Sequence, residues 1–162
     1  MKIHFRQVQP KDWEAIMKIE NQGFSPAEAA SRAAMKERIE NIPETFIVAA
    51  KQEEILGYIV GPTFSQRYLA DELYQHTLSN NKSDDYQTVL SLAVAQPYRR
   101  HKIGTQLLTQ LAQVARSQKR QAITLTCLAT LIPFYEANGY INEGLSASQH
   151  ADEKWYNMVK NL

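Results

Sequence analysis

Apolar and polar residues follow two different rhythms along this chain. Seven short stretches are rich in apolar or β-branched side chains and predict strands: 3–8, 46–50, 55–60, 87–94, 122–128, 140–143 and 154–160. The second and third flank Gln52-Glu53-Glu54 and predict a β-hairpin. The fourth is almost wholly apolar in its second half, which is typical of a central strand buried on both faces.

Helical spacing of apolar residues appears between these strands. Pro10 stands at a favoured first position of a helix, and Trp13 and Ile16 continue the helical spacing until Gly23 ends it. Ser25-Pro26-Ala27-Glu28 has the form of a capping box, which predicts a second helix from there to Asn41. Three further helices are predicted, the first and last of them short: 67–75, 103–118 and 131–138.

The order of elements changes after residue 86. From there the chain reads strand, helix, strand, helix, strand, and a strand–helix–strand unit of roughly 40 residues implies two parallel strands joined by a right-handed crossover. We therefore predict an α/β (α+β) fold. Its sheet is mixed, mostly antiparallel and twisted, with six or seven strands, a central parallel pair and about four flanking helices.

Composition and charge narrow the class of protein. A chain of 162 residues has the length of one domain, so we expect a single domain over residues 1–162. Lys and Arg (18) nearly balance Asp and Glu (17), which gives no reason to expect nucleic acid or an anionic membrane as a partner. The single cysteine, Cys127, agrees with a cytoplasmic location. The sequence contains no cluster of His, Cys and Asp residues that would predict a metal site. It leaves the oligomeric state open, and a homodimer is compatible with it.

One segment stands out for its chemistry. The strand that ends in Leu92-Ala93-Val94 runs into the basic turn Arg99-Arg100-His101-Lys102, and Ile103-Gly104-Thr105 then opens a helix. The first backbone N–H groups of a helix have no partner within it and carry the positive end of the helix dipole, so they suit a phosphate. The turn therefore predicts a pyrophosphate site.

Two separated motifs resemble the GCN5-related N-acetyltransferase (GNAT) superfamily. They are the Leu92–Val94 strand with its basic turn, and the later Ile132-Pro133-Phe134-Tyr135 with Gly139-Tyr140. The order of elements on both sides also matches, so the resemblance spans essentially the whole chain. The junction from Asn21 to Ala30 looks most like the arylalkylamine N-acetyltransferase group.

The resemblance implies a GNAT fold and acetyl-CoA as co-substrate. In such enzymes the co-substrate lies where two central parallel strands splay apart, an amine attacks the thioester directly through a tetrahedral intermediate, and a tyrosine protonates the departing thiolate. Tyr135 occupies the position of that acid. The implied cofactor-binding residues are Leu92, Ala93, Val94, Arg99, Arg100, His101, Lys102, Ile103, Gly104 and Thr105.

The reaction requires the same parts for chemical reasons. A protonated amine is not a nucleophile, so a proton must leave before attack. The developing oxyanion needs an N–H donor, for which the backbone of Val94 is the candidate because a splayed strand frees it from the sheet. A phenol with a pKa of about 10 is suited to protonate a thiolate with a pKa of about 8.5, which fits Tyr135 as the acid.

Two positions depart from the family pattern. Lys102 stands where the pattern has a glycine, and a positive φ there would cost about 1 kcal/mol for a lysine. Related arylalkylamine enzymes carry two histidines on the strand before the Leu-Ala-Val segment, but the matching residues here are Thr88 and Leu90, and neither can act as a base. The sequence leaves the base unassigned among four candidates, which are Glu20, Glu28, His76 and Asp84.

The resemblance implies an acetyltransferase whose acceptor is a small primary amine, either an arylalkylamine or another small amine, with a polyamine left open. Four aromatic residues are candidates for lining the amine pocket: Phe24, Phe64, Tyr68 and Tyr86. A protein or peptide amine is the main alternative acceptor. The departures at Lys102 and at the missing histidines motivate another alternative, a module that binds CoA without catalysis.

Overall fold

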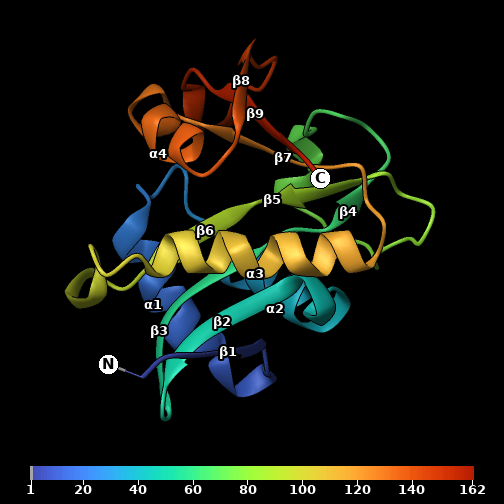
Figure 1. The fold of residues 1–162 in the computed structure, drawn as a ribbon. Helices are drawn as coiled ribbons and strands as arrows, with labels where there is room; N and C mark the ends of the chain where they lie inside the picture. Colours follow the sequence, from blue (N-terminus) through green and yellow to red (C-terminus); the bar gives the residue numbers. More distant parts are fainter. Residues whose placement is uncertain (1) are drawn as a thin grey trace.

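The computed structural model describes residues 2–162, and its first sheet is antiparallel throughout. Its four strands follow the order β1 (His4–Gln7), β2 (Phe46–Lys51), β3 (Glu54–Val60) and β6 (Ser91–Val94). The predicted hairpin is confirmed, with Lys51 opposite Glu54. Strand β6 therefore ends this sheet, with β3 as its one sheet neighbour (Figure 1).

The second sheet has five strands and contains the predicted parallel pair. Its order is β4 (Thr63–Phe64), β5 (Tyr86–Val89), β7 (Ala122–Cys127), β9 (Tyr156–Asn161) and β8 (Ile141–Leu145). Strands β5 and β7 run parallel, and the other neighbours are antiparallel. The predicted mixed α/β class is confirmed. The strand count rises from the predicted six or seven to nine, because β4 is an addition and the predicted strand 87–94 is two strands.

A break at Leu90 separates β5 from β6. The Leu90 N–H donates to the Val60 carbonyl at 2.7 Å and the Thr88 N–H donates to the Pro62 carbonyl at 3.0 Å, so the chain crosses the end of β3 here. Before the break β5 pairs with β7, and after it β6 pairs with β3. Strands β6 and β7 therefore diverge, and the two sheets splay apart between them.

Helices cover both faces of the first sheet. Helix α3 (Ile103–Ser117) packs on the face that presents Ile47, Leu56 and Ile59. Helices α1 (Trp13–Gly23) and α2 (Arg32–Asn41) pack on the opposite face, which presents Val48 and Tyr58. Tyr58 and Ile59 alternate with the period of two that a strand imposes on its side chains, whereas a β-bulge opposite Ala49 and Ala50 brings Leu56 to the face of α3. The short α4 (Ile132–Ala137) lies beside β8 and β9 (Figure 1).

The prediction that a helix begins at Ser25 is wrong. The segment from Ser25 to Ala29 forms a turn, and α2 begins at Arg32, where the Ser31 hydroxyl accepts a hydrogen bond from the Ala34 N–H at 3.0 Å. The Ala30 N–H donates instead to the Glu20 carboxylate of α1 at 2.8 Å, which interrupts any helical ladder. The predicted helix 67–75 is reduced to the 3₁₀ turn η3 (Asp71–Tyr74).

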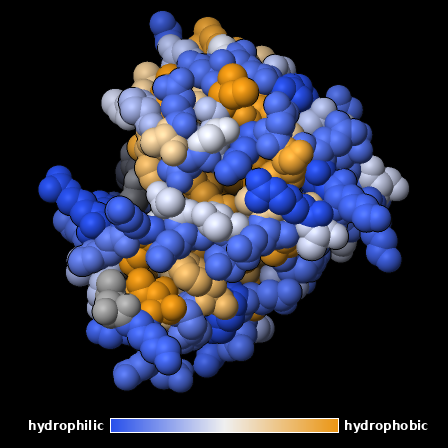
Figure 2. All heavy atoms as spheres, viewed as in Figure 1, coloured by the Kyte–Doolittle hydropathy of each residue, from blue (hydrophilic) through white to orange (hydrophobic). Residues whose placement is uncertain are grey.

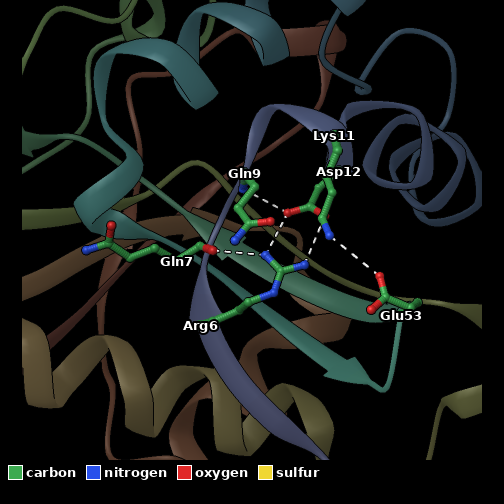
Figure 3. A network of polar contacts seen from close by, with 6 residues as sticks. All are labelled: Arg6, Gln7, Gln9, Lys11, Asp12 and Glu53. Carbon is green, nitrogen blue, oxygen red and sulfur yellow. Dashed lines mark hydrogen bonds and ion pairs between the residues drawn. The ribbon is translucent and has the colours of Figure 1, made fainter.

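An ion pair between the half-buried Arg6 and the buried Asp12 connects β1 to the start of α1 (Figure 3). The Arg6 guanidinium donates to both oxygens of Asp12 at 2.8 and 3.0 Å, and the Gln9 N–H donates to the same carboxylate at 2.8 Å. Burial raises the pKa of Asp12, but the hydrogen bonds from Arg6 and Gln9 and the neighbouring positive charges outweigh it and lower that pKa. The nearby Lys11–Glu53 pair, at 3.5 Å, is exposed.

We expect Asp12→Asn to destabilise the protein by about 2 kcal/mol at neutral pH, because it leaves the Arg6 charge without its partner. The pKa of Asp12 is lower in the folded protein than in the unfolded chain, where it is about 3.9. The ion pair therefore stabilises the folded protein above that pH, and this stabilisation is lost as the pH falls through the pKa of the folded state. Urea unfolding at pH 7 and pH 3 measures both effects. The free energy of unfolding should fall less between pH 7 and pH 3 in the variant than in the wild type. Lys11→Gln is the control, with a change within about 0.5 kcal/mol. Equal effects of the two substitutions would contradict the prediction.

Most of the surface in the view of Figure 2 is hydrophilic, with apolar residues exposed in separate small patches. Within residues 2–162, no helix is long and apolar enough to cross a membrane.

Candidate active site

The open edge of β6 provides unpaired backbone groups. The Ala95 N–H donates to the Leu56 carbonyl at 2.7 Å, and Ala93 lies opposite Tyr58. Backbone groups along an antiparallel strand point alternately to its two sides, so the groups of Leu92 and Val94 point away from β3. They face the splay, where β6 has no strand neighbour. Arg99 Nε donates to the Val94 carbonyl at 3.1 Å. The Val94 N–H points away from β3 and has no hydrogen-bond partner among residues 2–162.

The basic turn leads into the N-terminus of α3, which lines the same cavity as β6. The first helical bond runs from the Gln106 N–H to the Lys102 carbonyl at 3.0 Å, so the three preceding N–H groups, 103–105, have no partner in the helix. The side chain of Lys102, which directly precedes them, does not cap them. A Cβ on Gly104 would lie 3.4 Å from the Phe134 ring, which leaves little room for a larger residue beneath the helix start.

A cavity of about 480 Å³ gathers nine of the ten predicted cofactor-binding residues, and we call it the clamp cavity. They are Leu92, Ala93, Val94, Arg99, Arg100, Lys102, Ile103, Gly104 and Thr105. The tenth, His101, is exposed and lies outside the lining. Within residues 2–162, neither Arg100 nor Lys102 has an acidic partner, so both charges are available to an anion. Free N–H groups and unpaired cations are the donor set that a pyrophosphate requires.

Two residues of the turn adopt the left-handed conformation. Lys102 has φ 62° and ψ 20°, and Arg100 has φ 68°. The glycine that the family pattern places at position 102 would adopt this conformation freely, whereas a lysine is strained by about 1 kcal/mol. The strain persists at the position where an ammonium group can meet a phosphate.

We expect Lys102→Gly to stabilise the protein by about 0.5 kcal/mol and to weaken acetyl-CoA binding by about threefold to tenfold, because it removes both strain and charge. Urea unfolding and titration calorimetry measure the two effects. Lys119, with φ 61° at the far end of α3, is a matched control. Lys119→Gly should bring a similar gain in stability with unchanged affinity. Unchanged affinity in the Lys102 variant would contradict a phosphate contact.

A second cavity, of about 630 Å³, adjoins the clamp cavity, and we call it the acceptor cavity. Its walls come from the turn after α1, from α2 and η3, and from the 3₁₀ turn η6 (His150–Asp152). The first residues of β6 and the last residues of β7 also line it. Three residues line both cavities: Leu92, Leu131 and Tyr135. The two cavities therefore adjoin at these residues.

Tyr135 is 7% exposed and stands at this junction. Its ring packs edge-on against Phe134 and Tyr140, with ring centres 5.1 and 5.6 Å away. Burial, followed by the neighbouring Tyr140, Cys127 and Tyr74, raises the pKa of the Tyr135 hydroxyl well above its usual range. The hydroxyl therefore stays protonated at neutral pH and can donate to a negative charge.

Three of the four base candidates line the acceptor cavity, namely Glu20, Glu28 and His76. Asp84 does not, because its carboxylate accepts a hydrogen bond from Thr63 Oγ1 at 2.7 Å elsewhere in the fold. Cys127 also lines this cavity, and burial raises the pKa of its thiol to about 11, so it is a neutral wall residue.

Of the four aromatic residues predicted to line an amine pocket, one lines the acceptor cavity and three lie elsewhere. Phe24 lines the acceptor cavity. Phe64 and Tyr86 instead pair across β4 and β5, and the Tyr68 hydroxyl donates to Glu143 at 2.7 Å. The aromatic wall comes from three other residues, Tyr74, His150 and Trp155, of which the first two stack with ring centres 4.8 Å apart.

Two adjoining cavities, one suited to a phosphate-bearing ligand, are typical of a transferase that brings two substrates together. The chain belongs to the acetyltransferase (GNAT) family, whose model matches residues 13–140. The resemblance of the sequence to the GNAT superfamily is thereby confirmed and agrees with acetyl-CoA as co-substrate, whereas the likeness to the arylalkylamine group stays a prediction.

Solved structures share the fold. The loading GNATL domain of CurA from Lyngbya majuscula aligns with a TM-score of 0.85 at 13% identity, covering 99% of this chain and 98% of that chain. Ard1 from Thermoplasma volcanium aligns at 0.78 and 20%, covering 100% and 99%. The PaiA N-acetyltransferase from Thermoplasma acidophilum, in complex with coenzyme A, aligns at 0.75 and 16%, covering 100% of both. No curated protein matches by sequence.

Proposed function

We propose that this protein transfers the acetyl group of acetyl-CoA to a primary amine of a small molecule by direct attack. The observation that carries the proposal is the junction of the two cavities at Tyr135 and Leu92. Acetyl-CoA supplies an activated thioester carbonyl, and the family membership of the chain supports its use. The clamp cavity and the free edge of β6 would hold it, with Arg99, Arg100 and the start of α3 at the pyrophosphate.

The chain's own groups then divide the chemical work. The free N–H of Val94 stabilises negative charge on the carbonyl oxygen while the amine attacks. The buried Tyr135 hydroxyl gives its proton to the departing sulfur and regains one from the acetylated nitrogen. No covalent enzyme intermediate is needed, because both substrates meet at the same junction.

The acceptor cavity supports a small cationic amine. Its volume of about 630 Å³ lies within the range of small-molecule pockets. Four carboxylates line it, those of Glu20, Glu28, Glu37 and Asp71, and one cation of the Lys or Arg type, Arg38. Negative lining attracts an ammonium ion, and the aromatic rings of Tyr74 and Trp155 add a favourable surface for one.

Calorimetry with acetyl-CoA, followed by a thiol-release assay on a panel of amines, tests the proposal. We expect binding of acetyl-CoA and turnover of small primary amines, with aromatic amines and diamines compared directly. Turnover of peptides alone would transfer the activity to a peptide acceptor. Binding without turnover of any amine would favour a CoA-binding module, and no binding of acetyl-CoA would overturn the proposal.

A further inference from the structure

Glu20 is a buried carboxylate at the inner end of the acceptor cavity. It lies on α1, is 1% exposed and lines the cavity. One oxygen accepts a hydrogen bond from the Tyr58 hydroxyl of β3. The other accepts from the Ala30 N–H at 2.8 Å and from the Ser91 hydroxyl at 3.4 Å. A buried carboxylate held at a defined place by three donors has a fixed orientation.

Ser91 connects this carboxylate to the reaction centre. It is the first residue of β6, lines the acceptor cavity, and directly precedes Leu92, which lines both cavities. A hydroxyl both donates and accepts hydrogen bonds, so Ser91 can accept a proton from an amine while it donates its own to Glu20.

The surroundings of Glu20 balance its charge. Arg38 of α2 is 1% exposed and lines the same cavity, and its pKa is lowered by burial against the opposing effect of Glu20. Tyr58 is the titratable group that faces Glu20 from β3, and Tyr74 and Glu37 lie beyond, near Arg38. The Arg38 guanidinium donates to the Tyr74 carbonyl at 3.0 Å, and its other two nitrogens have no hydrogen-bond partner among residues 2–162.

We propose that Glu20, acting through the Ser91 hydroxyl, removes the proton that the acceptor amine must lose before it attacks. This proposal rests on the acetyl transfer proposed above. The ammonium N–H bond breaks toward Ser91 Oγ while the Ser91 proton passes to Glu20, which leaves a neutral amine and a protonated carboxyl. After attack, the second nitrogen proton goes by way of Tyr135 to the sulfur, and Glu20 returns the first to solvent. In this scheme Ser91 touches the amine and Glu20 is a positioning residue.

The other candidates have less suitable places. Glu28 is half-buried, and its carboxylate accepts a hydrogen bond from the Ser25 N–H at 3.0 Å within the turn that follows α1. His76 is 82% exposed in its side chain and lies 4.0 Å from Glu37 at the cavity rim. Neither has a hydrogen-bonded connection to β6, whereas Glu20 does.

The test compares two acceptors of different basicity in Glu20→Gln and Ser91→Ala. Phenethylamine is protonated at neutral pH and needs a base, whereas trifluoroethylamine is largely neutral and does not. For phenethylamine we expect kcat/KM to fall about 10²-fold in Glu20→Gln and about tenfold in Ser91→Ala, and for trifluoroethylamine to change less than about threefold. In Glu20→Gln, kcat/KM for phenethylamine should rise about tenfold per pH unit up to the pKa of the amine, while the wild-type profile levels off earlier.

Glu40→Gln is the control, an exposed carboxylate of α2 that lines neither cavity, and should keep wild-type rates on both amines. The affinity for acetyl-CoA, measured by calorimetry, should stay unchanged in all variants. Equal losses on both amines, or an unchanged pH profile in Glu20→Gln, would overturn the relay. The rate on trifluoroethylamine reports the folded fraction, so a loss of folding is distinguished from a loss of base. A wild-type protein without turnover would instead refute the acetyl transfer itself.

Discussion

Tyr135→Phe should lower kcat by about 10²-fold and leave the dissociation constant of acetyl-CoA nearly unchanged. The substitution removes one hydroxyl at the junction of the two cavities, where the departing sulfur needs a proton, and general acid catalysis contributes about 10²-fold to 10⁴-fold. The ring itself remains, so its packing against Phe134 and Tyr140 is kept. A thiol-release assay gives kcat, and calorimetry gives the affinity.

Tyr140→Phe provides the control for this experiment. The Tyr140 hydroxyl is buried without a hydrogen-bond partner among the described residues, and it lines neither cavity. Its removal should leave kcat within about twofold of the wild type. Unchanged turnover in Tyr135→Phe, or an equal loss in both variants, would refute the assignment of Tyr135 as the acid.

The pH dependence offers a second measurement of the same assignment. Burial, with the neighbouring tyrosines and Cys127, raises the pKa of Tyr135, so the neutral form that donates persists to higher pH than for an exposed tyrosine. We therefore expect no alkaline loss of kcat below a pH of about 10. A fall in kcat near pH 8 that disappears in Tyr135→Phe would show that the hydroxyl ionises earlier than its burial implies.

Gly61→Ala should destabilise the protein by about 3 kcal/mol or more. Gly61 follows β3 at the crossing with β5, and a Cβ there would lie 2.0 Å from the Thr88 carbonyl oxygen. The Cβ would be attached rigidly to the backbone after β3, and the oxygen that it meets belongs to the backbone of β5. Neither segment can move without disturbing a sheet. Urea unfolding measures the loss of stability.

Gly23→Ala tests whether the effect belongs to this position. Gly23 is the last residue of α1, and a Cβ there would lie 3.7 Å from the Ala93 side chain, an ordinary contact. Alanine also restricts the unfolded chain, so we expect a change between zero and a gain of about 1 kcal/mol. Comparable losses in the two variants would contradict the close approach at Gly61.

Local patterns predicted the elements and the fold class, but not the places where distant segments meet. The apolar run from Gln87 to Val94 gave one strand, and its break at Leu90 depends on the carbonyls of Val60 and Pro62 across the sheet. One hydrogen bond of the predicted capping box is present, because the Glu28 carboxylate accepts from the Ser25 N–H. The helix start moved because a carboxylate of another helix, Glu20, binds the Ala30 N–H.

The candidate site divides in the same way. The clamp is one continuous segment from Leu92 to Thr105, so its residues were recognisable together. The aromatic wall of the acceptor cavity combines Tyr74, His150 and Trp155, which are separated in sequence and meet through stacking and a bond from Trp155 Nε1 to the His150 carbonyl at 2.7 Å. No local pattern predicts such a wall, because each of these residues, taken alone, is typical of a loop or of the core.

The sharing of so few residues by the two cavities has a kinetic consequence. The clamp cavity is bounded by the starts of α3 and α4, and the acceptor cavity by α1, α2, η3 and η6. Because the two cavities share only three lining residues, a ligand in one leaves most of the other unoccupied, and both substrates can be bound at once. Initial-rate measurements with both concentrations varied should therefore give intersecting lines, as expected for a ternary complex, rather than the parallel lines of a covalent enzyme intermediate.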